Sequence, residues 1–208
     1  MFENGEVDAI EQISSQYFGH LNEYLNSFVG GGIMFLWINQ QGTSPETAAL
    51  LSNQNFRQAL NYGFDRSATV NAVNPGYKAY NRLVDSNFAG PDGGKFVDEY
   101  PVETVPLSGD VDKAKEYLAA AMEELGYSDV SQLPQLELIT WDTSEQKLLL
   151  ETIIDQWKQN LGLENIQLTQ YVIGTAIGSF YDLSYDLFAI TWETDVLPTD
   201  IMEAMVTG

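Results

Sequence analysis

The sequence predicts an α/β domain, with a mixed but mainly parallel sheet that carries helices on both faces. From residue 135 onward, strand-like segments alternate with segments of helical periodicity in the order β-α-β-α-β-α. Two uninterrupted apolar runs, 33–38 and 187–190, are typical of strands that a sheet buries on both faces. The chain has 208 residues, 44% of them hydrophobic, which is enough for one substantial core.

The first third contains two expected strands and one helix. Residues 7–10 fit a short strand, and residues 16–26 have apolar residues at helical spacing. The glycines at 30–32 are followed by neither Lys-Ser nor Lys-Thr, so they indicate a turn rather than a phosphate-binding loop. The run 33–38 is expected to be a central strand, and the amide of Asn39 to close the loop after it.

The middle of the chain is expected to hold helices and one long surface segment. Residues 53–62 form a helical pattern, and Arg57 within it is expected to hold a neighbouring turn. Asp65 is placed to cap a second helix that runs to Val73. Residues 81–106 contain three Gly and three Pro residues, which indicate a long surface excursion within one domain.

The last part alternates helices and strands. A helix is expected at 112–125, starting at Asp112 and ending at Gly126. Strands are expected at 135–140, 166–172 and 185–191, and weaker helices at 173–181 and near Pro198. The long helix that ends at Gly162 is capped by Thr143 or Ser144, and its expected inner face comprises Leu148, Leu149, Thr152, Ile153 and Trp157.

Composition excludes several classes of function. The net charge of −21, from 30 acidic and 9 basic residues, repels phosphate backbones and argues against a nucleic-acid partner. The absence of cysteine and the single His20 argue against thiolate chemistry and a multi-histidine metal site, and we expect no cofactor. No apolar run reaches membrane-spanning length, and the N-terminus lacks a signal peptide. The chain is therefore either cytosolic or a piece of a longer protein.

The main candidate site follows the last strand. There the chain carries Trp192 and, three residues on, Asp195, at the strand end where open α/β sheets gather ligands. An aromatic ring beside a carboxylate is a plausible recognition pair for an amine. The alternatives are that Asp195 is a turn residue before Pro198 and that Trp192 belongs to the core.

Two further residues are weaker candidates. Trp141 follows another strand end and is expected either to line the same cleft or to pack beside a helix cap. Lys147 would meet a ligand carboxylate, or lie on a solvated helix face. Catalysis has little support, because no nucleophile elbow occurs and the closest carboxylate pair, Asp182 and Asp186, only superficially suggests a glycosidase.

The stretch 55–66, NFRQALNYGFDR, contains Arg-Gln-Ala-Leu followed by Asp-Arg. This pattern resembles a signature of the peptide-binding, family 5 extracellular solute-binding proteins of ABC importers, and further motifs of that family follow in order along the chain. Tyr185-Asp186 with Trp192-x-x-Asp195 is similar to its strand and loop near the ligand. The chain departs from the family after that loop, where Val196-Leu197-Pro198 replaces the Tyr-acidic-Pro of many members.

The resemblance implies a non-enzymatic, periplasmic-binding-protein-like lobe. Residues 1–208 would form one lobe of two, with the first lobe before them and the chain's return after them. The ligand would be a short peptide, with Asp195 pairing its α-ammonium and the backbone at Thr191 and Glu193 pairing its main chain. The implied protein is an extracytoplasmic monomer, periplasmic or lipid-anchored, that delivers peptide to ABC permease subunits. Two alternatives stay open: a binder of another solute, such as a sugar or metal chelate, and a secreted glycoside hydrolase domain.

Overall fold

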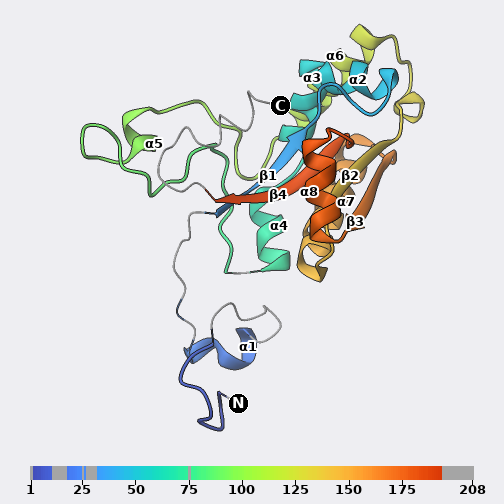
Figure 1. Ribbon diagram of the computed structural model, residues 1–208. Coiled ribbons are helices and arrows are strands. Elements are labelled where there is room, and N and C mark those ends of the chain that lie inside the picture. The colour runs from blue at the N-terminus through green and yellow to red at the C-terminus, as the bar shows by residue number, and fades with distance from the viewer. Residues whose placement is uncertain (1, 11–17, 25, 27–31, 75, 194–208) are drawn as a thin grey trace.

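A four-stranded sheet forms the centre of the computed structural model, which describes residues 2–10, 18–24, 26, 32–74 and 76–193 (Figure 1). The strand order is β1-β4-β2-β3. The strands are β1 (Gly32–Ile38), β2 (Leu136–Trp141), β3 (Ile166–Tyr171) and β4 (Leu187–Glu193). The four strands expected at 33–38, 135–140, 166–172 and 185–191 are therefore all present, with ends displaced by no more than two residues. The expectation that 33–38 is a central strand was wrong, because β1 lies at the edge of the sheet and its residues from Ile33 to Ile38 are only half-buried.

The sheet is mixed, as expected. Strand β1 pairs antiparallel to β4, from Gly32 opposite Glu193 to Ile38 opposite Leu187. Strand β2 pairs parallel to both β3 and β4. Two of the three pairings are parallel because the crossovers from β2 to β3 and from β3 to β4 each pass through a helix.

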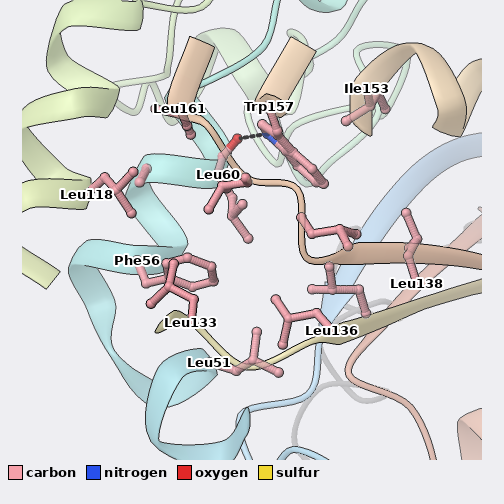
Figure 2. Close-up of a cluster of buried hydrophobic side chains, with 14 of the residues drawn as sticks. Leu51, Phe56, Leu60, Leu118, Leu133, Leu136, Leu138, Ile153, Trp157 and Leu161 are labelled. Atoms are coloured by element: carbon pink, nitrogen blue, oxygen red, sulfur yellow. Dashed lines mark hydrogen bonds between the residues drawn. The ribbon is translucent and has the colours of Figure 1, made fainter. Parts of the chain in front are cut away.

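One face of the sheet carries the larger core, which is built with five helices. These are α2 (Pro45–Ser52), α3 (Gln54–Tyr62), α4 (Arg66–Val73), α6 (Val111–Leu125) and α7 (Ser144–Leu161). Figure 2 shows side chains of α3, α6 and α7 converging on Leu136 and Leu138 of β2. The indole of the fully buried Trp157 donates to the carbonyl of Leu60 at 2.8 Å, which satisfies the one polar group of that side chain.

The opposite face of the sheet is covered by α8 (Ile173–Tyr181). Ala176 of that helix packs with Ile139, Phe188 and Ile190 of the sheet and with Tyr185. Strand β4 therefore alternates between two cores, with Leu187 and Ala189 on one face and Phe188 and Ile190 on the other. The prediction of helices on both faces is confirmed.

Local capping chemistry sets the helix boundaries. The side chains of Asn53, Asp65 and Thr143 accept backbone N–H groups at the starts of α3, α4 and α7. Gly126 and Gly162 end α6 and α7 at positive φ, 78° and 73°, a conformation that favours glycine. Helix α6 begins at Val111, one residue before the expected start at Asp112, and its cap is Asp110, whose side chain accepts the N–H of Lys113.

Some expectations about single elements were wrong. Helix α2 was not expected, and residues 7–10 form no strand. On α7, Leu148 is 49% exposed, whereas Leu150 is 0% exposed and belongs to the larger core. Of the expected helix 16–26, the structure describes α1 (Phe18–Leu21) and a 3-10 turn η2 (Asn22–Tyr24), which Figure 1 places away from the sheet. The helix expected near Pro198 lies outside the described residues.

The expected excursion at 81–106 is largely irregular, with the single short helix α5 (Phe96–Glu99). Two side chains at its start bond to backbone carbonyls of its later residues. Asn81 donates to the carbonyl of Val105 at 2.7 Å, and Arg82 donates to the carbonyl of Val97 at 3.0 Å. It is followed by α6, a 3-10 turn η3 (Val130–Gln132) and then β2. None of the helices in the described part is long and apolar enough to cross a membrane.

Candidate functional site

The carboxyl ends of β2, β3 and β4 meet at one edge of the sheet, together with the start of β1. This follows from the topology, because β2, β3 and β4 are parallel and β1 runs against them. The edge therefore brings together Trp141, Tyr171, Thr191 and Gly32. It is the position at which open α/β sheets bind ligands.

Among the described strands, only β1 pairs with the last part of β4. On the β1 side, pairing continues to Glu193. On the β2 side, pairing is limited to Leu138 with Leu187 and Ile139 with Phe188. The hydroxyl of Thr140 donates to the carbonyl of Ala189 at 3.1 Å, so the carbonyl of Ala189 points toward β2.

The direction of the Ala189 carbonyl determines where the following backbone groups point. Backbone N–H and C=O groups change sides at each residue of a strand, so Thr191 and Glu193 project them to the same side as Ala189. That side faces away from β1, and no described strand pairs with it at these residues. Within the described part of the chain, the end of β4 thus presents a short unpaired strand edge. The side chain of Thr191 is half-buried; those of Trp192 and Glu193, and all of Asp195, lie outside the described residues.

Trp141 is at the same edge, but its ring is partly used by the fold. It is half-buried and packs against the smaller core under α8. Next to it, Asp142 donates its N–H to the carbonyl of Tyr171 at 2.8 Å, and Thr143 caps α7. Trp141 is therefore packed beside a helix cap, as the second alternative expects, and stays half-buried.

Lys147 lies on the exposed side of α7. Its ammonium is 3.8 Å from the carboxylate of Glu151, one helical turn further on, and both side chains are about half exposed. Such a pair contributes little stability. The structure thus gives Lys147 a solvated helix face and places it in the second turn of the helix that follows β2.

Sequence reasoning missed a hydrogen-bonded cluster near the start of α7. Glu145 accepts from the amide of Asn74 at 2.6 Å and from the hydroxyl of Tyr77 at 3.1 Å. Burial, followed by the charge of Glu145, raises the pKa of the Tyr77 phenol. Glu145 was visible only as an acidic residue in the first turn of a helix, and nothing in the sequence linked it to residues about 70 positions earlier.

The carboxylates that superficially suggested a glycosidase are not a catalytic pair. Asp186 is 2% exposed and accepts hydrogen bonds from the backbone and hydroxyl of Thr43, both at 2.9 Å, and from the N–H of Glu137 at 3.0 Å. Asp182 is exposed at the end of α8. Asp186 therefore has a structural role, tying the loop after β1 and the start of β2 to β4.

Asn39 and Arg57, which were expected to have structural roles, both hydrogen-bond to backbone carbonyls. Asn39 donates to the carbonyls of Leu183 and Tyr185 at 3.0 and 2.8 Å, which closes the loop as predicted. Arg57 donates to the carbonyl of Leu51 at 2.9 Å, at the end of α2. Among the described residues, no group of His, Asp or Glu side chains is arranged to hold a metal ion.

The sequence matches one family model over nearly its whole length. The model is that of the bacterial extracellular solute-binding proteins, family 5, middle part, and it covers residues 1–206. A curated relative, the oligopeptide-binding protein OppA of Bacillus subtilis (strain 168), is 28% identical over 145 residues. The match covers 70% of this chain and 25% of that protein.

Solved structures give the same fold. Listeria monocytogenes OppA bound to peptide has a TM-score of 0.79 at 22% identity, over 94% of this chain and 38% of that one. The pheromone receptor PrgZ has a TM-score of 0.73 at 22% identity, over 94% of this chain and 37% of that one. The chain thus spans between about a quarter and two fifths of the length of these relatives.

Proposed function

Because the chain belongs to the family 5 bacterial extracellular solute-binding proteins, we propose that it forms one wall of a peptide-binding cleft. The protein containing it would capture short peptides outside the membrane and deliver them to an ABC permease. The relatives named as oligopeptide-binding proteins support peptide over the other solutes of the family.

The observation that carries the proposal is the free edge at the end of β4. Thr191 and Glu193 project backbone N–H and C=O groups to a side where no described strand pairs with them. An extended peptide satisfies such groups by adding as a strand. This mode recognises main chain, so it accepts many side-chain sequences.

Trp192 and Asp195 complete the proposed subsite. Asp195 would pair the α-ammonium of the peptide, and the ring of Trp192 would pack against its first residue. The exposed part of Trp141 would extend the same wall. Lys147 would contribute only when a peptide is long enough to carry its carboxylate to α7.

The proposed protein has two lobes. Residues 1–208 would supply a single α/β lobe, and the additional length seen in the relatives would supply the other lobe and the chain's return. Closure of the lobes about a hinge would bury the ligand. We further propose a monomer without enzymatic activity or cofactor, periplasmic or lipid-anchored at the outer face of the membrane.

A backbone substitution tests the strand-addition mode. In the two-lobe protein, Thr191→Pro removes the backbone N–H of residue 191, which would bond to the peptide. Hydrogen bonds to β1 are kept, because the backbone N–H of Thr191 points away from β1. We expect the affinity for trialanine, measured by calorimetry, to fall about tenfold, which corresponds to about 1.4 kcal/mol for one lost hydrogen bond. Unchanged affinity in a folded variant would contradict peptide addition at β4.

Identification of the retained ligand tests the class of solute. Native mass spectrometry of the two-lobe protein from its host is expected to show a set of short peptide masses. A single sugar or metal-chelate mass would instead assign another solute of the family.

A further inference from the structure

A polar cavity lies between the helices α3, α4 and α6 and the long excursion. It has a volume of about 430 Å³. Helix α3 contributes Gln58, Asn61 and Tyr62, α6 contributes Lys113 and Tyr117, and the excursion contributes Asn81 and Glu103 to Val105. Arg66, the first residue of α4, completes the lining.

Two cations line this cavity in a chain that has few of them. Only 9 residues are Lys or Arg, against 30 that are Asp or Glu. Even so, neither Arg66 nor Lys113 has a carboxylate within ion-pair distance among the described residues, where the ion pairs involve His20, Lys147 and Lys158. Most of the Lys and Arg side chains in the described part also have no ion pair, so the distinguishing feature of Arg66 and Lys113 is that they line one cavity.

Arg66 is held in place but retains hydrogen-bonding capacity. Its guanidinium donates to the backbone carbonyl of Asn61 at 3.1 Å and to the side-chain oxygen of the same residue at 2.5 Å. It also lies 4.3 Å from the centre of the Phe64 ring. A guanidinium has five N–H donors in a planar fork, so a side of the group remains for a planar acceptor such as a carboxylate.

The burial of Arg66 makes an anion favourable there. Desolvation lowers the pKa of its guanidinium, which shows that the surroundings disfavour the charge. An opposite charge brought into the cavity would offset that cost.

Lys113 supplies the second charge. Its ammonium lies 3.3 Å from the hydroxyl of Tyr62 and 4.7 Å from the centre of that ring. The carboxylate of Glu103 also lines the cavity and acts on Lys113, but at more than ion-pair distance. The cavity therefore combines two cations, one distant acid and the neutral donors of Asn81 and Gln58.

We propose that this cavity binds a small carboxylate-bearing molecule, with Arg66 and Lys113 as its two cationic contacts. The inference stands on the cavity and its charges, and it does not depend on peptide binding at β4. A molecule with two carboxylates fits the two cations best.

Glutarate is a suitable probe, with its neutral diamide glutaramide as the matched control. In a ¹H–¹⁵N NMR titration of the 208-residue chain, glutarate should shift the amides of the cavity lining and saturate with a Kd of about 1 mM or lower. Lys113→Gln should weaken binding about tenfold, the usual effect of one charge-assisted contact. Lys115→Gln removes the same charge from an exposed position on the same helix, so it should change the Kd less than about twofold.

Three outcomes would overturn the proposal. The first is the absence of a saturable amide shift up to about 10 mM glutarate. The second is that glutaramide shifts the same amides as much as glutarate does. The third is that Lys113→Gln and Lys115→Gln weaken binding equally. Tighter binding of inorganic phosphate than of glutarate would overturn the carboxylate class. Arg66→Gln should abolish binding; if that variant does not fold, the comparison of Lys113→Gln with Lys115→Gln decides.

Discussion

Two buried polar residues, Asp186 just before β4 and Asn39 just after β1, hold three parts of the chain together. Asp186 links the loop after β1 and the first residues of β2 to the last strand, and Asn39 closes the loop from the other side. Both are buried, so their hydrogen bonds have no water to replace them. These residues therefore fix the position from which β4 runs to the proposed ligand.

Asp186→Ala should destabilise the chain by about 3 kcal/mol, because it removes a buried carboxylate that accepts from the backbone and hydroxyl of Thr43 and from the N–H of Glu137. Urea denaturation followed by circular dichroism measures the change. The matched control is Asp182→Ala, at an exposed position four residues earlier, for which we expect a change within about 0.5 kcal/mol. Equal effects of the two substitutions would show that Asp186 does not have this role.

Asp195→Asn, in the two-lobe protein, tests the proposed ammonium contact. Truncating one member of a buried charge pair costs about 2–5 kcal/mol, or roughly 30- to 5,000-fold in affinity. N-acetylation of the peptide removes the same contact from the other side, so the two losses should not add in calorimetry. A variant that binds free and acetylated peptides as the parent does would identify Asp195 as a turn residue.

Among the elements, α7 allows the sharpest test of packing. Its inner face comprises Leu149, Leu150, Ile153, Trp157 and Leu161. Leu150→Ala should cost about 2–5 kcal/mol because it leaves a cavity at a fully buried position. Leu148→Ala makes the same chemical change where the side chain is half exposed, and it should cost less than about 1 kcal/mol. Chemical denaturation of the two variants measures both values, and similar costs would contradict the observed orientation of the helix.

The sequence predicted those elements whose determinants are local. Helix caps and C-terminal glycines depend on a few neighbouring residues. The starts of α3, α4 and α7, at Asn53, Asp65 and Thr143, were therefore located closely, as were the ends of α6 and α7 at Gly126 and Gly162. Helix α2 was missed because its apolar residues do not form a clear stripe. The choice between Leu148 and Leu150 depends on how α7 is rotated on the sheet, which is a tertiary property.

The candidate site was predictable to a smaller extent, for the same reason. The position of Thr191 and Trp192 at the carboxyl end of the last strand followed from the pattern of elements. The hydrogen-bonded cluster of Asn74, Tyr77 and Glu145 depends on contacts between residues far apart in the sequence. The same holds for the cavity between α3, α6 and the excursion.

On the scale of the whole molecule, the chain offers one wall of the proposed cleft. A ligand bound to one wall loses half of its contacts and stays hydrated, so closure cannot stabilise it. The 208-residue chain alone should therefore bind short peptides at least about 100-fold more weakly than the two-lobe protein, a difference of about 2.7 kcal/mol. Calorimetry with trialanine compares the two. Equal affinities would contradict the two-lobe proposal.

The pairing of the first strand with the last has a consequence for how the protein is made. Ile38 pairs with Leu187, 149 residues later, and β4 lies between β1 and β2, so the sheet cannot close before β4 is synthesised. At about 5–20 residues per second, β1 waits roughly 7–30 s for its partner. Throughout that interval the nascent chain lacks its central strand. Pairing between residues so far apart in the sequence also raises the contact order of the native structure, which slows folding. For a protein exported unfolded, as the proposed location outside the membrane implies, the sheet would stay incomplete until β4 itself has been made.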